Sequence, residues 1–168
     1  CASEWDCTLE GSAVRLGLRM IRGFPEAAAQ RVIAARPFPS VEALALRAGL
    51  NRRELACLAG SGALAVLAGH RRSAYWACAG ATGGGEGLAS FLLPETPATL
   101  APPAEGEEVV ADYASLGLTL GRHPLALLRP RLRKRRLLSA AALRALPHGR
   151  RASTAGLVTC RQRPDTAS

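Results

Sequence analysis

The side chains with the clearest chemistry in this sequence are cations gathered toward its C-terminal end. The stretch RPRLRKRRLL, residues 129–138, holds five arginines and one lysine without an acid. From Arg129 to Arg163 there are 11 basic residues and no acid, whereas residues 1–128 hold 11 basic residues against 12 acids. Because guanidinium groups bind phosphate through paired N–H donors, this uneven distribution predicts a polyanionic partner.

The groups that catalyse reactions are scattered along the chain. Two-metal phosphoryl transfer requires paired carboxylates that hold the ions about 3.5–4 Å apart. Asp6, Asp112 and Asp165 are isolated and no D-x-D occurs, while the adjacent acids Glu107 and Glu108 are typical of a helix start. No two histidines are spaced i, i+4 and no C-x-x-C occurs. We therefore expect reduced thiols, no metal or other cofactor and no catalytic centre within this chain.

The composition favours a mainly helical fold. Apolar residues make up 48% of the chain and aromatic residues only 4%, and strong helix formers dominate. No run of 18 apolar residues predicts a membrane span, and the acidic start CASEWDCTLE lacks the features of a signal peptide. We expect no membrane partner, and the absence of an initial Met indicates a processed or partial chain.

Helix-end signals place several short helices in the first half of the chain. AVRLGLRMI, residues 13–21, predicts a short strand that leads into a helix. Pro25 suits the first position of a helix that should end before Pro37. Ser40 is the expected cap of VEALALRA, and Asn51 with a glutamate three residues later predicts a capping box.

The order helix, RGFP, helix and then helix, AGLN, helix predicts two helix–hairpin–helix elements. A tight turn at a helix N-terminus presents backbone N–H groups, and the helix dipole adds roughly 0.3–1 kcal/mol toward an anion without reading any base. The alternative is that both turns are glycine-broken helical corners. The predicted DNA contacts are the hairpin residues and the nearby cations: Arg22, Gly23, Gly49, Asn51, Arg52, Arg53, Arg71, Arg72, Arg131, Arg133, Lys134, Arg135 and Arg136.

The second half begins with a change in composition. Residues 80–107 are rich in Gly, Pro, Ala and Thr without periodicity, which predicts a mobile linker. EEVVADYASLG then predicts a helix with Val109, Val110, Tyr113 and Leu116 on one face and Gly117 at its end. A further helix should start at Pro124 and be disturbed or ended by Pro130, and residues 151–163 have the composition of a strand.

Six stretches, in this order, resemble the bacterial DNA polymerase III α-subunit class, and most closely its error-prone translesion branch. They are SEWDCTLE, VRLGLRMIRGF, LACLAGSGAL, GHRRSAYW, DYASLGLTLGRHPL and AGLVTCRQRPDTAS. The resemblance implies five regions: the end of the fingers region (1–12), a tandem helix–hairpin–helix region (13–78), a Gly/Pro-rich linker (79–107), connecting helices with a basic bend (108–147) and the start of a truncated OB domain (148–168). The palm would lie upstream.

The resemblance further implies a cytoplasmic DNA-directed DNA polymerase that uses Mg²⁺ and acts in damage-induced mutagenesis and translesion synthesis. This segment would bind and position primer-template DNA and be inactive alone. Replicative relatives tend to have Gly-x-Gly in the first hairpin, whereas Pro25 lacks an N–H here, so we expect the second hairpin to contribute more.

Partners besides DNA are suggested by LASFLL, residues 88–93, which lies where replicative relatives carry a sliding-clamp-binding peptide. Phe91 and Leu92 would make that contact, or an accessory protein resembling a Y-family polymerase would replace it. The alternative functions are a stand-alone helix–hairpin–helix nucleic-acid-binding or repair scaffold and a protein–protein adaptor that uses LASFLL. The aromatic side chains of Trp5, Tyr75 and Trp76 are expected either to pack internally or to stack on bases.

Overall fold

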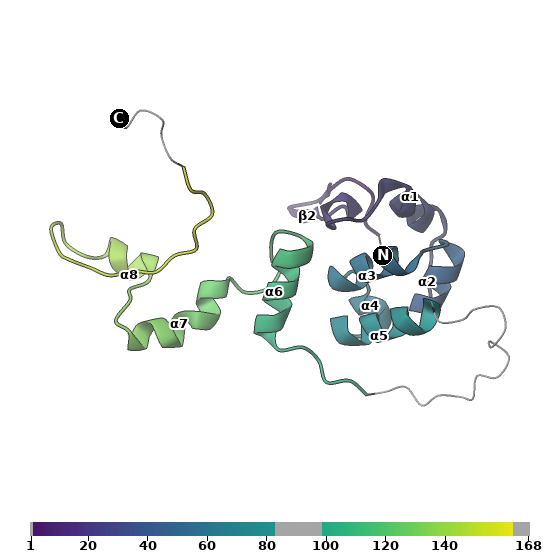
Figure 1. The fold of residues 1–168 in the computed structure, drawn as a ribbon. Coiled ribbons are helices and arrows are strands. Elements are labelled where there is room, and N and C mark those ends of the chain that lie inside the picture. The colour runs from purple at the N-terminus through teal and green to yellow at the C-terminus, as the bar shows by residue number, and fades with distance from the viewer. Residues whose placement is uncertain (1, 83–98, 163–168) are drawn as a thin grey trace. The chain divides into compact units, whose positions relative to one another are not determined.

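The computed structural model describes residues 2–82 and 99–162, and the chain divides into two compact units, Cys1–Gly121 and Arg122–Ser168. Helices dominate the first unit, and the described part of the second unit contains two helices followed by an extended chain (Figure 1), which confirms the mainly helical class. Within the described ranges, no helix is both long and apolar enough to cross a membrane.

The first unit begins with a small hairpin. Strands β1 (Thr8–Glu10) and β2 (Ala13–Arg15) pair antiparallel, with Leu9 opposite Val14, and a 3-10 helix η1 (Leu18–Met20) follows. The predicted strand-to-helix transition in residues 13–21 is therefore present, although its helix is a single 3-10 turn. The pairing also joins residues on both sides of the boundary that we predicted after residue 12.

Six α-helices follow in the described part of this unit: α1 (Glu26–Ala34), α2 (Val41–Arg47), α3 (Arg52–Gly60), α4 (Ala65–Ala68), α5 (Arg71–Thr82) and α6 (Glu105–Ser115). The predicted caps of α2 and α3 are confirmed. Ser40 Oγ accepts a hydrogen bond from Ala43 N at 3.1 Å, and Asn51 and Glu54 form a reciprocal capping box with both bonds at 2.9 Å. Pro25 is the N-cap of α1 and not its first helical residue, so that prediction was wrong by one position.

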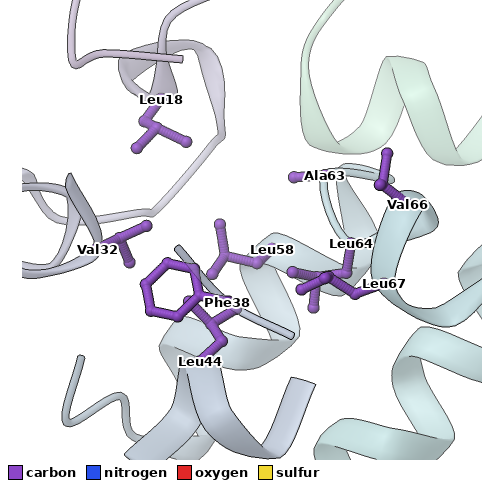
Figure 2. A pocket seen from close by; sticks show the side chains of 9 residues that line it. All are labelled: Leu18, Val32, Phe38, Leu44, Leu58, Ala63, Leu64, Val66 and Leu67. Carbon is purple, nitrogen blue, oxygen red and sulfur yellow. The ribbon is translucent and has the colours of Figure 1, made fainter. Parts of the chain in front are cut away.

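The core of the first unit lies between the two hairpin elements and α5. Leu55 and Leu58 of α3 are its largest fully buried side chains. Figure 2 shows Leu58 converging with Leu18 and Val32 on a small apolar cavity of about 60 Å³. The side chains of all nine residues that line it are apolar. The two hairpin elements are thus packed into one body and are not independent modules.

Ion pairs hold α6 against α5. Arg71, at the start of α5, pairs with Glu108 and with Asp112 (2.5 Å), and Val109 of α6 is buried. Our prediction that Val110 shares the buried face was wrong, since its side chain is 70% exposed. The face of α6 that packs against the rest of the unit carries Glu108 and Asp112, which are four residues apart, together with Val109. Val110 lies about 100° further round the helix than Val109 and therefore points away from this face.

The predicted linker is shorter than expected at both ends, because α5 continues to Thr82 and α6 begins at Glu105. Residues 83–98, which include LASFLL with Phe91 and Leu92, lie outside the described residues. Gly117 ends α6 as predicted, with a positive φ of 77°.

The second unit contains α7 (Pro124–Lys134) and α8 (Ala140–Arg144). Pro124 is in the first turn of α7 as predicted, and His123 caps it by accepting from Leu125 N at 3.2 Å. The prediction that Pro130 could end the helix was wrong, because α7 continues through it to Lys134. A proline inside a helix lacks one N–H donor and crowds the carbonyl of residue i−4. The chain turns at Arg136, which has a φ of 58° and lies within the predicted basic bend.

The range 151–163 was expected to be a strand. In its described part, up to residue 162, one parallel bridge joins Thr154 to Leu138, and no strand forms. The physical reason is that a strand needs several consecutive residues of a neighbouring strand to pair with. Here only Leu138 is available to residues 151–162, because the next residue, Ser139, accepts a hydrogen bond from Ala142 N and begins α8. An OB domain remains a prediction.

Candidate nucleic-acid interface

The first hairpin connects η1 to α1 and leaves several backbone donors open. Gly23 makes the turn with a φ of 76°, a conformation that L side chains adopt rarely. Arg22 N donates to Ser115 O at 2.8 Å, but within the described ranges no acceptor faces the N–H groups of Gly23, Glu26 and Ala27. The turn therefore presents donors to an anion even though Pro25 has none, while the exposed Glu26 carboxylate opposes it.

The second hairpin connects α2 to α3, and in the described residues the N–H groups of Arg52 and Arg53 have no acceptor, just as those of Glu26 and Ala27 have none at the start of α1. Gly49 makes the turn with a φ of 57°, and Gly49 N and Leu50 N donate to α2 carbonyls at 3.3 and 3.0 Å. The capping box consumes Asn51 N and Glu54 N. Glu54 is only 7% exposed, so a carboxylate already occupies the N-terminus of α3. This carboxylate opposes an anion at the second hairpin, as Glu26 does at the first, and the expectation that the second hairpin contributes more stays a prediction.

Arg31, a residue that the sequence analysis missed, clamps this second hairpin from α1. Its Nε donates to Ala48 O at 2.9 Å, and its Nη2 donates to both carboxylate oxygens of Glu54 at 3.0 Å. Arg31 and Glu54 are 23 residues apart, so no local pattern could reveal the pair. Arg31 thus fixes one hairpin element relative to the other.

Two of the predicted cations meet in one groove. Arg22, from the first hairpin, and Arg53, from the first turn of α3, line an open groove of about 450 Å³ between α3, α5 and α6. Both residues are exposed, and among the described residues no carboxylate pairs with either of them. The structure therefore brings cations from both hairpin elements to one surface, whereas the exposed Arg52, which precedes Arg53 in α3, is not among the residues that line the groove.

Arg71 and Arg72 do not belong to this surface. Arg71 is 7% exposed and lies between Glu108 and Asp112, and Arg72 pairs with Glu107 at 2.8 Å. Our prediction that Arg71 contacts DNA was wrong, because its charge is consumed inside the protein. Arg72 is likewise paired with a carboxylate, so the ion pair as a whole has little net charge to attract a phosphate.

The second unit carries the other predicted cations on its surface. Arg131, Arg133 and Lys134 lie in the last turn of α7, and Arg135 and Arg136 follow it, all of them exposed. Within the described residues, none of these five pairs with a carboxylate. Arg136 also lines an open hollow of about 500 Å³ with Arg151 and Ser153, and Arg151 is a cation that the sequence analysis left out of the contact set.

The groups gathered at this interface are guanidinium groups and backbone N–H donors, which bind anions. Across residues 2–82 and 99–162, no group of three His, Cys, Asp or Glu side chains is placed to hold a metal ion. Burial raises the pKa of the Cys78 thiol to about 11, so this cysteine is unreactive near neutral pH.

Comparison with known proteins agrees with this geometry. Residues 1–74 match the family model of the helix-hairpin-helix motif. The chain is 54% identical to the error-prone DNA polymerase of Alkalilimnicola ehrlichii over 98% of its own length, and 52% and 50% identical over 99% to those of Aromatoleum aromaticum and Pseudomonas paraeruginosa. It spans 17% of the length of each of these relatives.

Proposed function

We propose that this chain, a homologue of one segment of the error-prone DNA polymerases, binds and positions DNA for such an enzyme through its phosphates. The observation that carries the proposal is the meeting of Arg22 and Arg53, from two hairpin elements, in one groove without carboxylate partners among the described residues. Backbone donors and guanidinium groups recognise the charge of a phosphate and not the identity of a base.

The two units would contribute differently to binding. In the first unit, the packed core and the Arg31 clamp hold the hairpins rigidly, so that their donors meet phosphates at defined positions. In the second unit, the cations at the end of α7 would supply long-range attraction, which raises the rate of association and depends on salt. If about six phosphates are neutralised, affinity should fall roughly 10³-fold between 50 and 200 mM salt.

In the whole protein, polymerisation with Mg²⁺, and the synthesis past lesions that damage-induced mutagenesis requires, would be carried out by other regions. The segment would keep the primer-template in register for them, in the cytoplasm. Attachment to a sliding clamp through Phe91 and Leu92, or to an accessory polymerase-like protein, would be an additional contact.

The test is a salt titration of DNA binding with charge-matched variants. Fluorescence anisotropy would follow a labelled primer-template duplex bound to the chain, to Arg22→Ala/Arg53→Ala, and to Arg15→Ala/Arg19→Ala. The control pair removes the same charge, but Arg15 and Arg19 are neutralised by Glu10 and Asp6.

We expect Arg22→Ala/Arg53→Ala to lower the slope of log affinity against log salt by about 2, since each duplex phosphate contributes about 0.9. The control pair should change it much less. Binding by the unmodified chain that does not respond to salt, or equal effects of the two double variants, would contradict the proposal.

A further inference from the structure

We propose that the groove between α3, α5 and α6 holds one unpaired nucleotide of a DNA single strand, with its phosphate between Arg22 and Arg53 and its base on Tyr75. The inference rests on the proposed function, because it assigns a specific ligand to a surface already proposed to bind DNA. It goes further by naming an aromatic contact and by distinguishing single-stranded from duplex DNA.

The first argument is the placement of Tyr75. This side chain of α5 lies on the wall of the groove and is 47% exposed, so its ring is only partly used in packing. Gly60 of α3 makes room for it, since a Cβ at position 60 would lie 2.7 Å from Tyr75 Oη. Ala111 and Ala114 of α6 also line the groove, and their small side chains leave space for a flat ring.

The second argument is charge. Two guanidinium groups reach the groove from separate elements, and none of the described residues that line it is acidic. An isolated aromatic hollow would accept many apolar ligands, whereas two cations beside an aromatic ring match the phosphate and base of a nucleotide. Base stacking on aromatic side chains, combined with cationic tracking of the backbone, is the general mode of single-strand binding.

The third argument is size. At about 450 Å³ the groove has the scale of a small-molecule site. Inside a duplex both faces of each base are covered by neighbouring base pairs, so the length of a duplex can reach the rim cations with its phosphates but offers no base to Tyr75; only the two terminal pairs have an open face. The occupant is therefore an unpaired nucleotide, as in a template overhang.

The neighbouring aromatic residue provides a matched control. Trp76 follows Tyr75 in α5 and is 61% exposed, but it lines a different hollow with Val41 and Leu67. Removing either ring deletes an exposed aromatic group from the same helix. A difference between the two variants can then be assigned to the groove.

The experiment measures the affinity of the chain and of Tyr75→Ala, Tyr75→Phe and Trp76→Ala for a dT oligonucleotide and for a blunt duplex at one salt concentration. We expect Tyr75→Ala to weaken binding of the oligonucleotide about tenfold, within the range measured for one stacked base. Tyr75→Phe keeps the ring and should bind like the unmodified chain, as should Trp76→Ala. Blunt-duplex affinity should be the same for all four.

Equal oligonucleotide affinities for Tyr75→Ala and Trp76→Ala would overturn the inference, as would an equal weakening on the blunt duplex. If the unmodified chain binds duplex with the expected salt slope, either result leaves the proposed function intact. Failure of the unmodified chain to bind any DNA would reject both.

A measurement on the unmodified chain tests the inference without any substitution that changes folding. Cys57 lines the same groove and is half-buried, whereas Cys7 is exposed near the β1–β2 hairpin. Saturating dT oligonucleotide should slow alkylation of Cys57 by N-ethylmaleimide, read by mass spectrometry of the digested protein, and leave the rate at Cys7 unchanged. Unchanged alkylation of Cys57 at saturation would overturn the inference.

Discussion

The two units of this chain use the same residue type in opposite ways. In the first unit, arginines largely meet carboxylates: the six that form ion pairs are Arg15, Arg19, Arg31, Arg36, Arg71 and Arg72. In the second unit, no acid occurs from Arg122 to Arg163, and its described residues include no buried side chain. A cation therefore stabilises the fold in one unit and remains available to a polyanion in the other.

This difference explains why the cations left over in the first unit matter. Arg22 and Arg53 are two of the four arginines of this unit, with Arg47 and Arg52, that form no ion pair among the described residues, and these two line the same groove. In the described part of the second unit, the cations from Arg131 to Arg136 all lack a carboxylate partner, so the lack of one identifies no single site there. Charge alone predicts a binding surface, but the ion pairs decide which cations of a folded unit belong to it.

The largest effect that we predict follows from removing the Arg71 ion pairs. Arg71→Ala leaves Glu108 and Asp112 next to each other without their cation, and breaking a buried pair in this way typically costs about 3–5 kcal/mol. Urea unfolding followed by circular dichroism would measure the free energy of unfolding. Arg133→Ala in the second unit is the control, and equal stability of the two variants would show that the buried pair contributes nothing.

A smaller decrease in stability is expected for Arg31→Ala. The variant removes the donors to Ala48 O and Glu54, but the Arg31 side chain is partly exposed, so solvent screening reduces the effect to about 1–2 kcal/mol. Because Arg31 holds one hairpin element against the other, DNA affinity should fall although Arg31 is not proposed to touch DNA.

Arg31→Lys separates the two roles in this prediction. It keeps the charge but not the forked donor geometry, and it should resemble Arg31→Ala in stability. Full stability of Arg31→Lys would mean that charge, and not the hydrogen bonds to the hairpin, accounts for the clamp.

Local signals predicted much of the first unit, and long-range partners account for what they missed. Ser40 and the Asn51–Glu54 box are caps read within four residues, and the structure confirms them. The partners of Arg71 lie 37 and 41 residues away in sequence, across the undescribed residues 83–98, so its burial left no local trace.

The same reason applies to the site and to the second unit. The hairpins were predictable from their glycines and the capping box from Asn51 and Glu54, but the contact of Arg31 with the Glu54 carboxylate comes from another helix and left no local signal. The composition of residues 151–163 favours a strand, yet a strand also needs a neighbour that composition cannot supply. In the described residues Leu138 offers a single bridge.

A third prediction uses pH to compare cysteines in the two units. Burial raises the pKa of Cys78 to about 11 in the folded state, against about 8.5 in an unfolded chain. Above about pH 8.5 the folded state keeps a proton that the unfolded state releases. The contribution of Cys78 to the free energy of unfolding is therefore complete below about pH 8.5 and disappears as pH rises toward 11.

Between pH 8 and pH 10, the stability of the unmodified chain should therefore fall by about 1–2 kcal/mol more than that of Cys78→Ala. Cys160→Ala, which removes an exposed thiol of the second unit, should follow the pH dependence of the unmodified chain. Parallel curves for Cys78→Ala and the unmodified chain would contradict this prediction.

The smallest change in stability should accompany the removal of a cation from the second unit. Arg133 is exposed on α7 and has no carboxylate partner among the residues described, so Arg133→Ala should alter the free energy of unfolding by no more than about 0.5 kcal/mol. Its effect should appear in DNA binding, as a decrease of about 0.9 in the salt slope, because the variant neutralises one phosphate fewer. A change in stability comparable to that of Arg71→Ala, with the salt slope unchanged, would mean that the second unit uses its arginines as the first one does.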